Sequence, residues 1–86
     1  MNDQKYNGWA NYQTWRIALE WFDENMNDMF DLKQDAVDLA DDLRDYLYDT
    51  VSESVKYQFI AGYVYYFLQA VDWKEIAEHL IENNKD

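Results

Sequence analysis

Carboxylates are the most abundant ionisable groups of this chain, and several of them recur at helical spacing. The 86 residues include 18 acidic and 7 basic side chains, which gives a net charge of −11. Twelve of the acidic residues lie between positions 20 and 53, where the only basic residues are Lys33 and Arg44. Five aspartates of this region recur at spacings of 3, 4, 3 and 4, which would align them on one side of a helix. We call these five residues the Asp row: Asp35, Asp38, Asp42, Asp45 and Asp49.

The Asp row has a charge spacing close to that of a nucleic acid strand. On a helix it would span about 21 Å, with one carboxylate about every 5 Å. A DNA strand carries a phosphate about every 3.4 Å of axis, so about six phosphates would occupy the same length. The row therefore predicts a surface that imitates DNA phosphates and binds a basic partner. Asp31, Asp41 and Glu24 are expected to extend this surface.

The acidic region is also compatible with two roles that need no partner. A solvated helix face rich in aspartate provides solubility without contacting any other molecule. Adaptation to high salt also favours acidic surfaces, but it would acidify the whole molecule. Here residues 1–19 carry a net charge of +1 and residues 54–86 a net charge of −2, so the charge is regional. A chain of this charge repels phosphates and anionic lipids, so we expect no direct contact with nucleic acid or membrane.

The patterns of catalytic and metal sites are missing from the sequence. There is no cysteine, the only histidine is His79, and the serines at 52 and 54 fall at an expected helix start without a nearby base. Neither a calcium-binding loop nor an H-E-x-x-H zinc motif occurs. We therefore expect no enzyme activity, no metal and no cofactor. His79 follows Glu75 by four residues and is expected to be an exposed side chain that the helix dipole and the Glu75 carboxylate stabilise.

The spacing of apolar residues predicts an all-α fold, a single small domain of about four helices. The chain has no proline and only two glycines, so helix breakers are rare. Residues 1–10 are expected to form an irregular arm and residues 11–86 one helical domain. Asn11 is a suitable N-cap for the first helix. The buried face of that helix is predicted to consist of Trp15, Ala18, Leu19, Phe22 and Met26.

The second and fourth helices have clear apolar faces. The second is predicted over residues 32–48, with a buried side formed by Leu32, Ala36, Leu39, Ala40, Leu43, Tyr46 and Leu47. The fourth begins at Asp72-Trp73-Lys74-Glu75, which has the form of a capping box. It is expected to end near Asn83 and to bury Trp73, Ile76, Ala77, Leu80 and Ile81.

The third helix is predicted to lie at the centre of the domain. Its start is placed at Thr50, because Thr50-Val51-Ser52-Glu53 also has the form of a capping box. From Val55 to Val71 the sequence is apolar nearly all round, and such helices are usually surrounded by others. Tyrosine hydroxyls would then reach the edges of the core. The most apolar run, residues 59–68, is about half of the ~20 residues that span a bilayer.

Two strings of residues near the ends of the chain resemble a known protein family. Gly8-Trp9-Ala10-Asn11-Tyr12-Gln13-Thr14-Trp15, followed by Ala18-Leu19, resembles a start that reads N-Y-E-T-W-N-V-A-L-W. Val71-Asp72-Trp73-Lys74-Glu75-Ile76-Ala77-Glu78-His79 resembles an end that reads N-W-x-E-I-A-E-H. These patterns are found in small proteins of phages, plasmids and bacteria with no established activity. The resemblance implies a helical fold and a mobile-element origin.

Together, the charge and the resemblance predict an inhibitor. We expect an acidic phage or mobile-element protein that binds a basic DNA-binding host protein, of defence or regulation, and inhibits it by DNA mimicry. The host cytoplasm is the expected location, because cysteine is absent and the N-terminus lacks a signal-peptide pattern. The alternative is a small adaptor or assembly module that binds a protein partner through aromatic residues. Its contacts would be Tyr6, Trp9 and the tyrosine-rich third helix.

Overall fold

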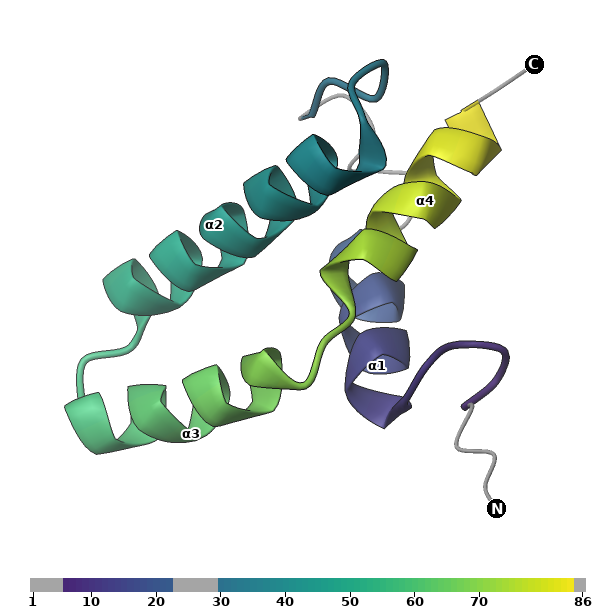
Figure 1. Cartoon of the computed structure of the whole chain (residues 1–86). Helices are drawn as coiled ribbons and strands as arrows, with labels where there is room; N and C mark the ends of the chain where they lie inside the picture. The colour runs from purple at the N-terminus through teal and green to yellow at the C-terminus, as the bar shows by residue number, and fades with distance from the viewer. Residues whose placement is uncertain (1–5, 23–29, 85–86) are drawn as a thin grey trace.

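The computed structural model describes residues 6–22 and 30–84, and its regular structure is helical. The four helices are α1 (Tyr12–Trp21), α2 (Ala36–Ser54), α3 (Gln58–Gln69) and α4 (Trp73–Asn84). Within the described ranges there is no β-strand, so the predicted all-α class is confirmed. Figure 1 shows α2 and α3 as two arms of a V, with α1 and α4 on the side where the V opens. None of the described helices is both long enough and apolar enough to cross a membrane.

The first helix begins where the sequence predicts but buries a different face. The Asn11 side chain accepts a hydrogen bond from the Thr14 backbone N–H at 2.8 Å, which confirms the N-cap. Thr14, Ile17 and Ala18 are buried in α1, and Phe22 just after it. Leu19, predicted to be core, is 54% exposed, and Trp15 is only half-buried. The Thr14 hydroxyl accepts a hydrogen bond from the Asp72 N–H at the start of α4, so Thr14 lies on the buried side. Met26 lies outside the described residues.

The second helix is longer at its C-terminal end than predicted. Thr50 does not cap a new helix, and its hydroxyl donates a hydrogen bond of 2.8 Å to the Tyr46 carbonyl one turn earlier. The helix therefore continues to Ser54. Residues 55–57 then run extended, and α3 starts only at Gln58. The capping box predicted at 50–53 is wrong, and so is the third-helix start at Thr50.

The core lies mainly between α2 and α4, which have the most extensive contact of any two helices. Leu39, Leu43 and Leu47 are almost completely buried, as the second-helix pattern predicts. From α4, Ile76, Ala77 and Leu80 are buried, as predicted. Full burial of one leucine side chain contributes about 1.5–3 kcal/mol. The other members of the buried cluster are Ile17, Ala18, Phe22, Leu32, Ala40, Leu68 and Val71.

The apolar third helix is not at the centre of the domain, which corrects the prediction. Of its residues only Ala61 and Leu68 are buried. Its contact with α2 includes Tyr48 and Tyr65, whose rings stack with centroids 5.3 Å apart. The physical reason is that α2 and α4 already cover each other's apolar faces. One side of α3 is therefore left exposed.

Candidate functional site

The Asp row lies on one side of α2, with all five side chains exposed. Asp35 is the residue before the first turn, and its side chain makes no capping hydrogen bond. The remaining four follow at helical spacing beside the buried Leu39 and Leu43, so the burial of the leucines orients the row toward solvent. Asp31 and Asp41 are exposed as well, while Glu24 lies outside the described residues. The structure thus brings the five row residues together as one exposed acidic face.

The contacts of the Asp row with other side chains are few and exposed. Arg44 lies 3.5 Å from carboxylate oxygens of Asp41 and Asp45, and all three side chains are 46–70% exposed. Such exposed pairs contribute only about 0–1 kcal/mol, because water screens them. Gln34 donates a hydrogen bond of 2.9 Å to Asp42. Since α2 carries six acidic residues and one basic residue, Arg44 leaves most of the negative charge uncompensated.

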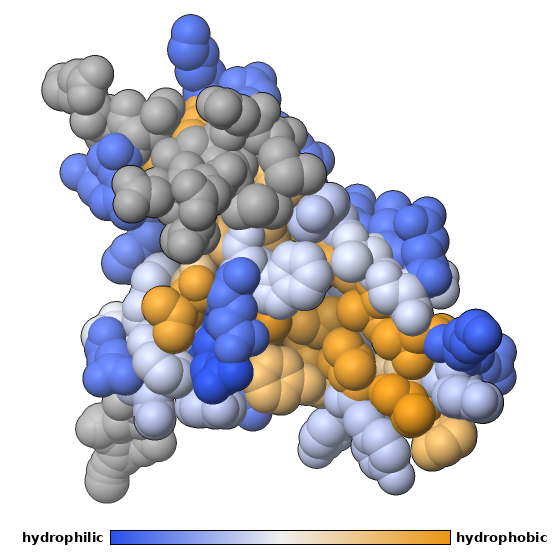
Figure 2. All heavy atoms as spheres, turned by 180° about the vertical axis from the view of Figure 1, so that it is seen from behind, coloured by the Kyte–Doolittle hydropathy of each residue, from blue (hydrophilic) through white to orange (hydrophobic). Residues whose placement is uncertain are grey.

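A second candidate surface is the outer side of α3. Large side chains there are 40–78% exposed, and we call them the α3 aromatic face: Tyr57, Phe59, Ile60, Tyr63 and Tyr66. Figure 2 shows hydrophobic surface over α3 and the place where it meets α2, with hydrophilic side chains along the outer edge of α2. Exposed apolar surface concentrated in this way is typical of interaction sites. This exposure differs from the predicted central position of the helix, because an apolar helix fits a buried position and an exposed one equally well.

The two strings that carry the family resemblance meet in space and form a polar clasp. The Ala10 N–H donates to a Glu75 carboxylate oxygen at 2.8 Å. The Asn11 side-chain amide donates to the Ala70 carbonyl at 2.7 Å. The Thr14 hydroxyl oxygen accepts a hydrogen bond of 2.8 Å from the Asp72 N–H. These contacts join the two parts of the chain, and nothing in the local spacing of either string points to them.

Contacts of the clasp replace one of the two hydrogen bonds of the capping box that was predicted for α4. Half of the box is present, because the Glu75 N–H donates to an Asp72 carboxylate oxygen at 3.1 Å. In a complete box the Glu75 side chain would return to the Asp72 N–H. Here Ala10 engages Glu75 and Thr14 engages Asp72, so both groups are satisfied by residues of the N-terminal string. The start of α4 is therefore a point of attachment for the N-terminal string.

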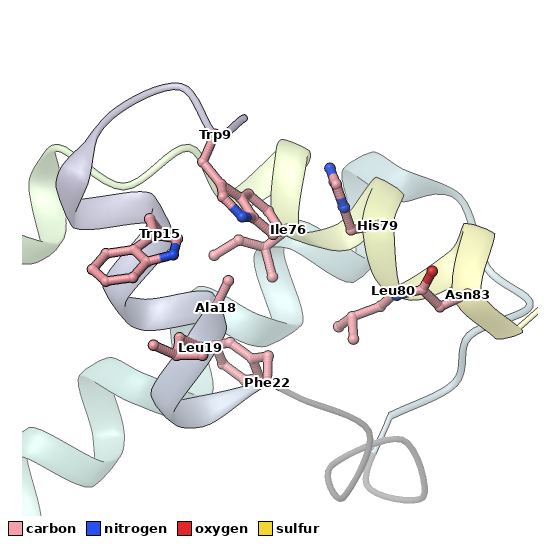
Figure 3. A pocket seen from close by; sticks show the side chains of 9 residues that line it. All are labelled: Trp9, Trp15, Ala18, Leu19, Phe22, Ile76, His79, Leu80 and Asn83. Carbon is pink, nitrogen blue, oxygen red and sulfur yellow. The ribbon is translucent and has the colours of Figure 1, made fainter. Parts of the chain in front are cut away.

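His79 borders a groove between α1 and α4 beside this clasp. Its ring is exposed and stacks on the Trp9 indole, with centroids 4.0 Å apart. The exposure of His79 agrees with the prediction. The Glu75 carboxylate, which was expected to stabilise His79, accepts a hydrogen bond from the Ala10 N–H. The groove has a volume of about 230 Å³. Figure 3 shows its side chains: Trp9, Trp15, Ala18, Leu19, Phe22, Ile76, His79, Leu80 and Asn83.

The other aromatic residue of the predicted arm is packed against α1. Tyr6 and Trp9 exchange backbone hydrogen bonds of 2.7 and 2.8 Å across a turn formed by Asn7 and Gly8. The left-handed backbone of Gly8, with φ of +88°, suits glycine at this turn. The Tyr6 ring packs against Tyr12 and Trp15 with centroids 5.2 and 4.9 Å away. Tyr6 and Trp9 thus hold the N-terminal string on the helices.

The exposed side chains present negative charge on α2 and apolar area on α3. Within the described residues, no group of three or more His, Asp or Glu side chains is placed to hold a metal ion. The two surfaces that stand out are the Asp row and the α3 aromatic face.

The fold and these surfaces define a small all-α protein with an acidic helix and an exposed aromatic helix. The chain belongs to a family of unknown function, DUF7249, which matches residues 2–85. This membership agrees with the resemblance to a family without an established activity. Comparisons with curated proteins and with solved structures gave no match.

Proposed function

We propose that this protein binds a basic DNA-binding protein of a host cell through the Asp row and inhibits it by DNA mimicry. The observation that supports the proposal is the exposure of all five row side chains on one side of α2. A groove that binds DNA presents lysine and arginine at spacings set by phosphates, and the row offers carboxylates at a similar spacing. The inhibitor would act in the cytoplasm and derive from a phage or another mobile element.

The electrostatics of α2 favour binding over a purely structural role. Aspartates three and four residues apart repel each other and cost a helix a few tenths of a kcal/mol per pair. Lysine partners at the same spacing would remove this cost, but α2 carries Arg44 as its single basic residue. The uncompensated charge also attracts a basic partner over a Debye length of about 8 Å at physiological salt.

The test is a pull-down from host lysate at low and high salt, followed by competition with DNA for the captured protein. The tested variant combines Asp38→Asn, Asp42→Asn and Asp45→Asn. The control combines Glu20→Gln, Glu78→Gln and Glu82→Gln, which removes the same charge outside α2. We expect the control to bind and the row variant to lose binding at low salt. Equal binding by both variants, or binding that DNA does not displace, would exclude mimicry.

The second candidate function is that of an adaptor that binds a protein through the α3 aromatic face. Its supporting observation is the exposure of Tyr63 and Tyr66, at 74% and 78%. Apolar contact is nearly independent of salt, whereas attraction between charges weakens as salt rises. A partner that is retained at high salt and is lost with Tyr66→Ser would favour the adaptor.

A further inference from the structure

We propose that the α3 aromatic face binds the same face of a second copy of this chain, so that the protein forms a symmetric dimer. This inference concerns a different surface from the Asp row and does not depend on DNA mimicry. Its starting point is the exposure of four large side chains on α3, a helix covered on one side only, and of Tyr57 just before it, whose ring lies 6.2 Å from that of Phe59. Four features of this surface favour a second copy as its partner, namely its charge, its self-complementarity, its area and Gly62.

The charge distribution favours contact between two copies of the same neutral surface. Residues 57–71 contain no charged side chain, although the chain as a whole has a net charge of −11. A basic partner would gain no electrostatic attraction at this neutral surface. A second copy places one neutral surface against another, and the interface itself then contains no repelling pair.

The chemistry of the face is self-complementary. Phe59, Tyr63 and Tyr66 lie at positions i, i+4 and i+7, so they form a single stripe along α3. In a two-fold contact, a residue i of one copy meets a residue j of the other, and residue j of the first copy meets residue i of the second. A tyrosine hydroxyl both donates and accepts a hydrogen bond, so stripes of this composition can satisfy each other.

The exposed area is sufficient for a stable contact. Aromatic side chains bury about 150–250 Å² each. At their exposed fractions, the four aromatic side chains together with the partly exposed Ile60 present about 600 Å² per chain. Two copies would then bury about 1,200 Å², the lower end of the range for specific interfaces.

Gly62 leaves room for a second backbone to approach α3 closely. It lies inside the helix, where glycine is less favourable than alanine. It is exposed, and a Cβ atom added there would meet no atom within 4 Å. Nothing in the described chain therefore requires a glycine at this position. The missing Cβ would let a partner helix pack more closely against α3.

The test is sedimentation equilibrium of the full chain over a wide range of concentration. We expect a species of twice the 10.5 kDa chain mass for the parent. Tyr63→Glu should raise the dimer Kd by about tenfold or more, because two buried charges would face each other. Val37→Glu is the matched control, since Val37 is an exposed apolar residue of α2 and the charge change is the same. This control should remain a dimer.

Gly62→Ala and the effect of salt complete the test. Gly62→Ala should retain or increase helicity by circular dichroism while it weakens the dimer, which separates assembly from folding. Added salt should strengthen the dimer, because it screens the repulsion between two acidic chains. Binding to a basic partner through the Asp row would weaken instead, so the two proposals fail independently. A parent that stays monomeric, or a dimer that survives Tyr63→Glu, would overturn the proposal.

Discussion

The backbone N–H of Ala10 donates a hydrogen bond of 2.8 Å to the side-chain carboxylate of Glu75, across 65 positions of the sequence. This contact joins the N-terminal string to the first turn of α4. Because the acceptor is ionised and the pair is partly buried, the bond is stronger than an ordinary exposed one.

Removing the Glu75 carboxylate should therefore destabilise the fold. We expect Glu75→Ala to lower the free energy of unfolding by about 1–3 kcal/mol, measured by urea denaturation. Glu78→Ala is the control, because Glu78 lies on the same helix but is exposed and pairs with Lys74 at 3.8 Å. Its effect should stay within about 0.5 kcal/mol. Equal losses in the two variants would mean that the Ala10 contact adds no stability.

Thr14 offers a sharper test of the clasp, because it is completely buried. Thr14→Val keeps the shape of the side chain but removes the hydroxyl that accepts from the Asp72 N–H and donates to the Asn11 side-chain oxygen. We expect a loss of about 1–3 kcal/mol in the free energy of unfolding. Thr50→Val, which removes a hydroxyl that bonds only to its own helix, should cost less. The reverse order would contradict the role of Thr14 in attaching α1 to α4.

Leu43 and Leu19 are both predicted to be buried, but the structure buries only Leu43. Leu43 is fully buried, so Leu43→Ala should cost about 2–5 kcal/mol in thermal or chemical unfolding. Leu19 is 54% exposed, so Leu19→Ala should change the stability by less than about 1 kcal/mol. A large loss at Leu19 would show that it is core, as the sequence pattern predicts.

The Asp row should not contribute to stability. Replacing Asp38, Asp42 and Asp45 by Asn relieves repulsion on α2, so the melting temperature should stay the same or rise slightly at low salt. The difference from the parent should shrink as salt is added, because screening weakens the repulsion in both. A marked fall in the melting temperature would mean that the carboxylates stabilise the native fold and were retained for that purpose.

Local patterns were sufficient for several features of this protein. Asn11 caps α1 and Asp72 caps α4, because a cap depends on residues within one turn of the helix start. The buried leucines of α2 also follow from their spacing, since periodicity defines which side of a helix is apolar. The Asp row follows from the same periodicity, so its exposed alignment on α2 could be expected before its partner is known.

Tertiary structure decided what local patterns leave open. Thr50 and Glu53 have the form of a cap, yet α2 continues through them to Ser54. The clasp joins residues about 60 positions apart, which spacing within one string cannot reveal. An apolar helix satisfies the same pattern in a core and at an interface, and here α2 and α4 cover each other and leave one side of α3 exposed. The sequence by itself determined the all-α class and the acidic row, because both depend on the spacing of neighbouring residues, although it misplaced the boundary between α2 and α3. Only the packing of α2 against α4 decided that the aromatic residues of α3 face outward, because apolar surface is buried wherever the helices happen to meet.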